Sequence, residues 1–160
     1  VVSGGEPTVW ADLPEFFRKI KALGFLTKLD TNGHHPEMIK RLLKEKLVDY
    51  VAMDVKTSLS EYPKLVGGGV KPEHIRKSID LLRTSQIPYE FRTTLIKEVH
   101  SEKILKDMER LLKGAERYYL QTFRPGHTLN PIFATYHPFS AEEMRKVAER
   151  FGCSFVGLRM

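Results

Sequence analysis

The chain has 160 residues, of which 41% are hydrophobic and 29% are charged, and its formal net charge is +6. This length and composition predict one globular domain that spans residues 1–160. No apolar run approaches the roughly 20 residues that a membrane-spanning helix needs, and lysines and arginines are interleaved with glutamates. We therefore expect neither a membrane nor a nucleic acid as a partner.

Cys153 is the one cysteine of the sequence. It excludes a disulfide within the chain, which favours a reducing, cytoplasmic location. One thiolate is also too few for an iron–sulfur cluster, so a small buried residue is the preferred interpretation of Cys153. The chain opens on a β-branched strand at Val1 rather than on methionine, and we expect that a preceding segment is missing.

Strands and helices alternate along the chain. A strand at the start leads into two glycines, and apolar patterns predict further strands over residues 25–30, 49–56, 88–95, 117–123 and 154–158. Helical periodicity predicts helices over residues 13–23, 36–47, 72–82, 101–112 and 140–151. The spacings of Asp12 with Glu15 and of Ser140 with Glu143 are those of a capping box. The alternation predicts an α/β fold with a parallel sheet, either an open partial (β/α) barrel or a doubly wound sheet.

Polar side chains occur where the predicted strands end. They are Glu6, Asp30, Thr31, Asn32, Asp54, Lys56, Arg92, Thr94, Gln121 and Thr122. Side chains two positions apart share one face of a strand, so Asp54 should point with Lys56, and Glu90 with Arg92 and Thr94. Charges inside a parallel sheet are costly unless they are paired or used. We favour a ligand site over a ring of structural salt bridges, because ligands bind at the carboxyl ends of such strands.

The segment Gly4-Gly5-Glu6-Pro7 follows the first strand. Two glycines allow a ligand to approach the backbone, Glu6 adds a negative charge that suits an amino group, and Pro7 stiffens the exit. This spelling resembles the GGEP motif of radical S-adenosylmethionine (radical SAM) enzymes, where it holds the amino group of the cofactor.

Three further motifs extend the resemblance to the radical SAM activating enzymes of glycyl-radical proteins. They are Asp30-Thr31-Asn32-Gly33, Asp54-Val55-Lys56 and Arg92-Thr93-Thr94, one on each successive strand. Finer features resemble one branch, the anaerobic ribonucleoside-triphosphate reductase activating proteins. These features are Met53 to Lys56 followed by Tyr62 and a glycine cluster, the segment Gln121 to Gly126, and Pro138-Phe139-Ser140 with Glu142-Glu143-Met144. The resemblance implies a partial (β/α) barrel that lacks its first βα unit and the Cys-x-x-x-Cys-x-x-Cys loop carried there.

The resemblance also implies a set of cofactor-binding residues, and no catalytic or metal-binding residue is assigned. The set comprises Gly4, Gly5, Glu6, Pro7, Asp30, Thr31, Asn32, Asp54, Lys56, Arg92 and Gln121. The first loop would hold the SAM amino group, and Asp30, Thr31 and Asp54 would lie near the carboxylate and ribose. Lys56 or a metal ion would supply a cation between facing carboxylates. Arg92 would pair with cofactor oxygens, and Gln121 and Thr122 would border the adenine.

The implied function is activation of anaerobic ribonucleotide reductase. In that reaction a reduced 4Fe–4S cluster, supplied with electrons by flavodoxin or ferredoxin, cleaves SAM, and the resulting 5′-deoxyadenosyl radical abstracts hydrogen from a glycine of the reductase. Because the cluster cysteines are absent from this sequence, we expect this chain alone to be inactive. Two alternatives stay open: activation of another glycyl-radical enzyme, such as a formate-lyase, and a SAM- or partner-binding module without a redox role.

Several loop residues have weaker interpretations. His34-His35 indicates a solvated turn rather than a metal pair, and His127 a plain loop histidine. Gly67-Gly68-Gly69 lacks the Gly-Lys-Ser/Thr ending of a phosphate loop. We expect this glycine loop and Arg124–Thr128 to contact the protein partner.

Overall fold

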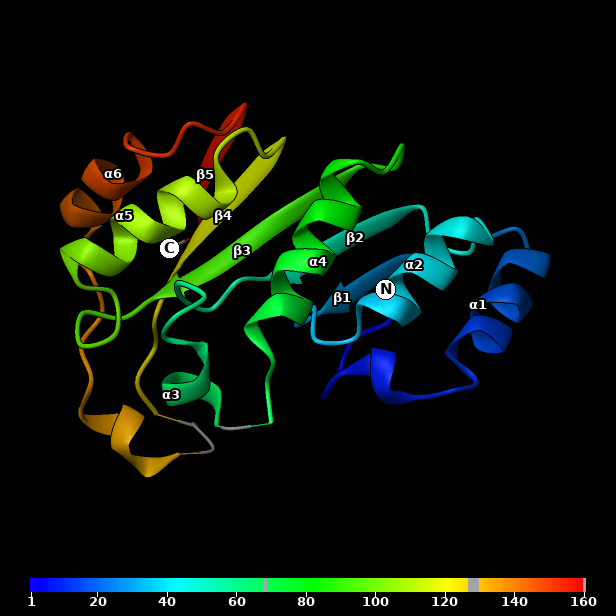
Figure 1. Ribbon diagram of the computed structural model, residues 1–160, viewed down its shortest axis with the longest axis horizontal. Helices are drawn as coiled ribbons and strands as arrows, with labels where there is room; N and C mark the ends of the chain where they lie inside the picture. Colours follow the sequence, from blue (N-terminus) through cyan, green and yellow to red (C-terminus); the bar gives the residue numbers. More distant parts are fainter. Residues whose placement is uncertain (68, 127–129, 160) are drawn as a thin grey trace.

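A five-stranded parallel sheet forms the centre of the molecule (Figure 1). The computed structural model describes residues 1–67, 69–126 and 130–159; Gly68, His127 and Thr128 of the expected partner loops lie outside this range. The strands follow chain order across the sheet: β1 (Lys28–Thr31), β2 (Tyr50–Asp54), β3 (Tyr89–Leu95), β4 (Arg117–Thr122) and β5 (Phe155–Arg159). Every neighbouring pair is parallel, so the predicted α/β fold with an open sheet is confirmed.

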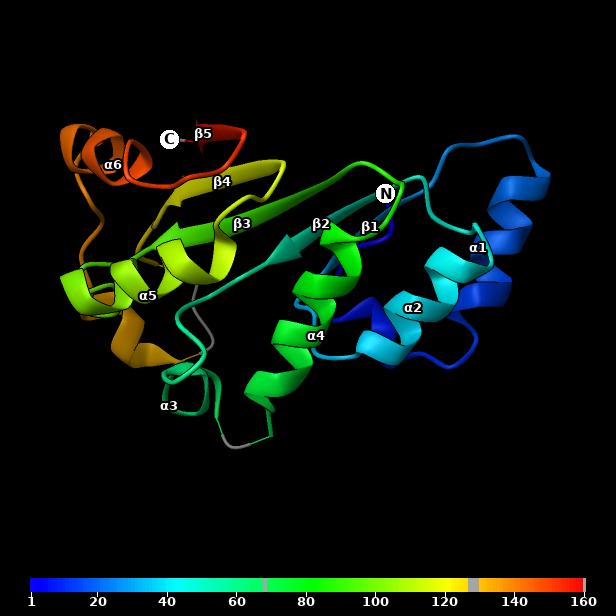
Figure 2. The same cartoon turned by 45° about the horizontal axis from the view of Figure 1, so that its top comes forward.

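Helices connect the strands and cover one face of the sheet. The longer ones are α1 (Leu13–Ala22), α2 (Pro36–Lys44), α4 (Pro72–Arg83), α5 (Glu102–Leu112) and α6 (Ala141–Ala148). Figure 2 shows α1, α2, α4 and α5 along the same side of the sheet. Their apolar stripes meet buried strand residues such as Leu29, Met53 and Phe91, all of which are fully buried. None of the helices within the described residues is long and apolar enough to cross a bilayer.

Shorter helical turns lie in the loops around the carboxyl ends of the strands. They are the 3-10 helix η1 (Pro7–Val9), the one-turn helix α3 (Tyr62–Val66) and the 3-10 helix η2 (Pro131–Thr135). Only loops were expected over residues 62–66 and 131–135. Both helical turns begin with a proline in their first two positions, where the missing N–H is not needed.

The first strand is shorter than predicted. Val2 alone forms a parallel bridge with Leu29, with its N–H 2.7 Å from the carbonyl oxygen of Lys28. The next strand begins at Lys28 rather than at Phe25, because Phe25 and Leu26 lie exposed on the surface, at 63% and 84% exposure. Apolar composition suggested strand there, but no neighbouring strand pairs with these two residues among the ladders described.

The two predicted capping boxes have different outcomes. At α6 the prediction is confirmed, since Ser140 Oγ accepts from the Glu143 N–H at 3.2 Å and Glu143 Oε2 accepts from the Ser140 N–H at 2.6 Å. At α1 it is wrong, because the Asp12 side chain makes no capping hydrogen bond. Asp12 has φ −89° and ψ 0°, a helical conformation, whereas a capping residue needs extended backbone.

The face opposite the helices carries the charged strand residues. Paired residues of a parallel sheet point to the same side, and the register joins Asp54 with Arg92 and Thr94 with Gln121. We call this side the polar face and define it by ten residues. They are Lys28, Asp30, Tyr50, Asp54, Glu90, Arg92, Thr94, Tyr119, Gln121 and Arg159.

Candidate functional site

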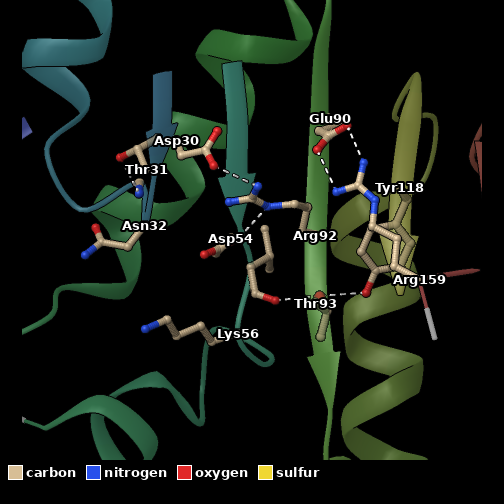
Figure 3. Close-up of polar contacts among 12 residues, drawn as sticks. Asp30, Thr31, Asn32, Asp54, Lys56, Glu90, Arg92, Thr93, Tyr118 and Arg159 are labelled. Atoms are coloured by element: carbon tan, nitrogen blue, oxygen red, sulfur yellow. Dashed lines mark hydrogen bonds and ion pairs between the residues drawn. The ribbon is translucent and has the colours of Figure 1, made fainter. Parts of the chain in front are cut away.

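Arg92 lies between two carboxylates at the centre of the polar face (Figure 3). Its Nε donates to Asp54 Oδ1 at 2.7 Å and its Nη1 donates to Asp30 Oδ2 at 3.0 Å. Three adjacent strands thus each supply one member of the group. Burial by itself lowers the pKa of Arg92, but the two aspartates outweigh it and the pKa is raised. Arg92 is therefore the cation between these two aspartates, and the role of Lys56 as a cation toward the cofactor carboxylate stays a prediction.

Glu6 fastens the first loop to the turn after β1. Its Oε1 accepts from the Thr31 hydroxyl at 2.7 Å, and its Oε2 accepts from the Asn32 N–H at 2.6 Å. The Thr8 N–H donates to Oε1 at 3.1 Å, and the Thr8 hydroxyl donates to the same oxygen. The Gly-Gly-Glu-Pro and Asp-Thr-Asn-Gly motifs, about 25 residues apart in sequence, are thus joined by charge-assisted hydrogen bonds.

The two glycines of the first loop serve its backbone conformation. Gly4 has φ 102° and Gly5 has φ 56°, in the left-handed region that other residues rarely adopt. A Cβ built on either would meet no atom within 4 Å. The loop is therefore open to a ligand, and Pro7 is buried at the start of η1 behind it.

A cavity of about 770 Å³ lies at the carboxyl ends of β2 and β3, beside α3 and η2. Asp54 at the end of β2, Lys56 just after it and Arg92 of β3 line it together. Its apolar wall consists of Val55, Leu65, Val66, Ile96 and Phe133. Among the residues that the structure describes, the Lys56 ammonium has neither an ion pair nor a hydrogen bond. A cation next to an apolar wall is available to a ligand.

Gln121 lies at the margin of this arrangement. It is half-buried on β4 beside Thr94, on the polar face, but it does not line the cavity. Thr122 pairs with Leu95 and so alternates to the helix-covered face, which argues against its predicted contact with the same ligand. The structure brings the other charged candidates into two groups, Glu6 with Thr31 and Asn32, and Asp54 with Lys56 and Arg92. Asp30 lies between the two groups, because it precedes Thr31 in β1 and accepts a hydrogen bond from Arg92.

A second ion pair on the polar face was not anticipated. Glu90 is 3% exposed, and its two oxygens accept from Arg159 Nη1 and Nη2 at 3.1 and 3.0 Å. The Tyr50 hydroxyl adds a hydrogen bond of 2.9 Å, and the guanidinium of Arg159 stacks 3.8 Å from the ring centroid of Tyr119. The partners are 69 residues apart, so no sequence spacing indicates the pair. This buried carboxylate is fully partnered, which favours a structural role.

The histidines after β1 do not form the solvated turn that was expected. His34 Nε2 accepts from the Lys71 N–H at 3.2 Å, and the His34 ring lies 5.4 Å from that of His74. Burial, followed by the neighbouring His35 and His74, lowers the pKa of His34. Within the described ranges, no group of three or more histidine, cysteine, aspartate or glutamate side chains is arranged to hold a metal ion.

The cavity brings together groups for three kinds of contact. The Asp54 carboxylate suits an ammonium group, the Lys56 ammonium suits a carboxylate, and the apolar wall suits a flat ring system.

Comparison with known proteins gives the family. Residues 1–111 match the model of the radical SAM superfamily. A protein of Methanocaldococcus jannaschii, provisionally named a glycyl-radical enzyme activating enzyme, is 36% identical over 159 residues, which are 94% of this chain and 66% of that protein. This chain therefore spans just under two thirds of the relative's length.

Solved structures share the fold at lower identity. A domain of pyruvate-formate lyase-activating enzyme from Bacteroides vulgatus has a TM-score of 0.73 and 19% identity, over 96% of this chain and 95% of that one. Streptococcus suis SuiB bound to S-adenosylmethionine has a TM-score of 0.68 and 15% identity, over 96% of this chain and 38% of that one. The open parallel sheet, the motif on each strand end and the match to the family model agree, and the chain belongs to the radical SAM superfamily.

Proposed function

We propose that the polar face binds S-adenosylmethionine and serves the activation of a glycyl-radical enzyme, with anaerobic ribonucleoside-triphosphate reductase as the target. The observation that carries the proposal is the Asp30–Arg92–Asp54 group, which opens onto the cavity beside Lys56. The relative from Methanocaldococcus jannaschii supports the type of reaction through its provisional name.

The residues present fit the cofactor. Asp30 Oδ1 is buried without a hydrogen-bond partner and lies 3.5 Å from Lys28 Nζ, so this oxygen has acceptor capacity for an ammonium group. Lys56 provides a cation for the cofactor carboxylate, and the apolar wall of the cavity is suited to adenine. Bound SAM would supply a sulfonium whose cleavage yields the reactive fragment. This chain's own residues bind the cofactor and orient it.

The residues of this chain do not fit a 4Fe–4S cluster. Such clusters are held by several cysteine thiolates, and the sequence contains Cys153 alone. Cys153 is half-buried before β5, its thiol donates to the Leu112 carbonyl at 3.4 Å, and burial raises its pKa. A protonated thiol in that place is not a cluster ligand. No reaction step through a cluster is assigned to the residues of this chain.

Cofactor binding is tested by isothermal titration calorimetry with SAM. We expect Arg92→Ala to weaken binding about tenfold or more, because one variant removes a cation and leaves two aspartates unpaired. Arg110→Ala is the matched control, since Arg110 is exposed on α5 and pairs with Asp107. If the wild-type protein releases no heat with SAM, or if both variants bind alike, the proposal is wrong.

The identity of the partner is a separate question. The Gln121–Gly126 segment and the Pro138-Phe139-Ser140 segment favour the reductase, whereas the fold shared with the Bacteroides vulgatus enzyme makes a formate-lyase the second candidate. The described parts of the two loops, Gly67 with Gly69 and residues 124–126, are the proposed contact surface. Flavodoxin or ferredoxin is the proposed electron donor, on the family resemblance.

Partner choice is tested by biolayer interferometry with the immobilised chain and each purified partner. We expect saturable binding of the anaerobic reductase and weaker or no binding of pyruvate formate-lyase. Arg124→Glu should reduce the signal, because Arg124 is exposed in one of these loops, and the exposed Lys106→Glu on α5 serves as the control with the same change of charge. The opposite order of affinities would assign the chain to the second candidate.

A further inference from the structure

The backbone of Lys56 is held by two buried side chains. Its N–H donates to the Tyr62 hydroxyl at 2.9 Å, and its carbonyl oxygen lies 3.0 Å from His100 Nε2. Tyr62 is 2% exposed and His100 is 3% exposed. Tyr62 belongs to α3, and His100 comes just before α5, so two separate segments converge on one residue.

The contacts of His100 favour one tautomer. Its Nδ1 lies 3.0 Å from the Ile96 nitrogen and 3.1 Å from the Ile96 carbonyl oxygen. That carbonyl already accepts from the Val99 and His100 N–H groups, whereas the Ile96 N–H can only donate, so we assign Nδ1 as the acceptor of this N–H, without a proton. The proton of the neutral ring is therefore on Nε2, which donates to the Lys56 carbonyl. Burial lowers the pKa of His100, which keeps the ring neutral beside a lysine. The ring thus has a fixed direction, from the end of β3 to Lys56.

Lys56 lies just outside the hydrogen-bonding ladder of the sheet. β2 ends at Asp54, and the Val55 N–H still donates to the Arg92 carbonyl at 2.8 Å. The Val55 carbonyl accepts from the Thr93 hydroxyl at 2.5 Å. At Lys56, one position further, both backbone groups bind to side chains instead of to a strand. The direction of the Lys56 side chain into the cavity is therefore decided by Tyr62 and His100.

We propose that His100 is a positioning residue for Lys56: its neutral ring fixes the Lys56 carbonyl, and Tyr62 fixes the Lys56 N–H, so that the ammonium is held toward the cofactor carboxylate. The inference deepens the proposed function and rests on Lys56 being a ligand of SAM. His100 also lines the cavity, so the ring closes the wall as well as holding the backbone. Neither contact is indicated by a sequence motif.

A pair of substitutions separates the two hydrogen bonds of His100. In His100→Asn the amide oxygen replaces Nδ1 and still accepts from Ile96, but the donor to Lys56 is lost. In His100→Gln the longer side chain places an N–H near the position of Nε2, so the donor to Lys56 is restored. Tyr62→Phe removes the other contact. Tyr89→Phe is its control, because Tyr89 is also buried and its hydroxyl also accepts from a backbone N–H, that of Glu116, at the start of β3.

Two measurements are made on each variant. Hydrogen–deuterium exchange of the peptide that covers residues 54–58 reports on the segment without any ligand, and calorimetry reports the dissociation constant for SAM. We expect His100→Asn and Tyr62→Phe to raise exchange in that peptide and to weaken SAM binding about fivefold to tenfold. We expect His100→Gln and Tyr89→Phe to stay within about twofold of the wild type in affinity.

The outcomes distinguish this inference from the proposed function. Unchanged exchange and unchanged SAM affinity in His100→Asn would overturn the positioning role. Increased exchange with unchanged SAM affinity would also overturn it, because Lys56 would then be held without a consequence for the cofactor. If wild-type protein does not bind SAM, the proposed function fails and the inference fails with it, whereas exchange still reports whether His100 holds the segment. Melting temperatures identify variants that merely unfold.

Discussion

Phe91 and Arg92 are neighbours in β3, yet their side chains lie on opposite faces of the sheet. Phe91 is fully buried under the helices with Met53 and Tyr118, in contacts that depend on shape and area. Arg92 points the other way, and two carboxylates hold it at distances of 2.7 and 3.0 Å. One face therefore stabilises the fold by apolar burial, and the other holds charges in fixed positions beside a cavity.

The two faces should therefore respond differently to substitution. Changes on the helix-covered face should affect stability, and changes on the polar face should affect binding. Loss of an apolar group leaves a void that the packed helices cannot fill. Loss of a charge on the polar face leaves a partner unpaired but still partly reached by water. Changes to residues of both faces test this division, and the effects expected on stability decrease from Phe91→Ala to Glu15→Gln.

Phe91→Ala should have the largest effect on stability. Removal of a fully buried aromatic side chain typically lowers the free energy of unfolding by about 3–5 kcal/mol. Urea denaturation followed by circular dichroism measures the change. Thr94→Ala, three positions further on β3 and exposed on the polar face, is the control and should be nearly neutral. Equal losses in the two variants would contradict the division between the faces.

Gly33→Ala should come next, because the turn after β1 touches both faces. Gly33 has φ 75°, and a Cβ there would lie 2.0 Å from Met53 Cε. Gly24→Ala is the control, with φ 81° and nothing within 4 Å. Left-handed backbone costs each variant about 1–2 kcal/mol, and crowding adds about 1 kcal/mol or more at Gly33. The double variant Gly33→Ala with Met53→Ala should recover the crowding part, as a double-mutant cycle in urea would show.

Acidification should destabilise the protein by a smaller amount. Burial lowers the pKa of His100 in the folded state below its ordinary value of 6.5. The unfolded chain therefore binds more protons, so the free energy of unfolding falls as the pH drops below about 6.5 toward the folded pKa. His34 contributes in the same direction. His100→Gln should flatten the dependence of stability on pH between pH 7 and 5, and an unchanged slope would remove His100 as a cause.

Glu15→Gln should have the smallest effect. The carboxylate pairs with Lys19 at 2.9 Å on the outer surface of α1, where both side chains are more than 60% exposed. Their hydrogen bond lowers the pKa of Glu15, but water and salt screen such a pair. We expect no measurable change in melting temperature at 0.15 M salt. A clear drop would mean that surface ion pairs contribute to the fold alongside the buried face.

Much of the fold was predictable because it depends on local patterns. Proline at the first turn marked α2 and α4, and the Ser140–Glu143 spacing marked the start of α6. The parallel sheet followed from the alternation of strands and helices. The strand predicted at Phe25 and Leu26 is wrong, because no neighbouring strand of the described ladders pairs with these residues. The cap predicted at Asp12 is wrong, because the backbone of Asp12 is helical.

By itself, the sequence determined the order of the elements, the motif at each strand end and therefore the family, because hydrophobic period and turn chemistry act over a few residues. Only the tertiary structure decided which charges meet. Arg92 bridges the aspartates of two neighbouring strands, Arg159 reaches Glu90 across 69 positions, and His100 reaches Lys56 across 44. Such contacts depend on register and on the direction of side chains across the sheet, which are set when the strands and helices pack together.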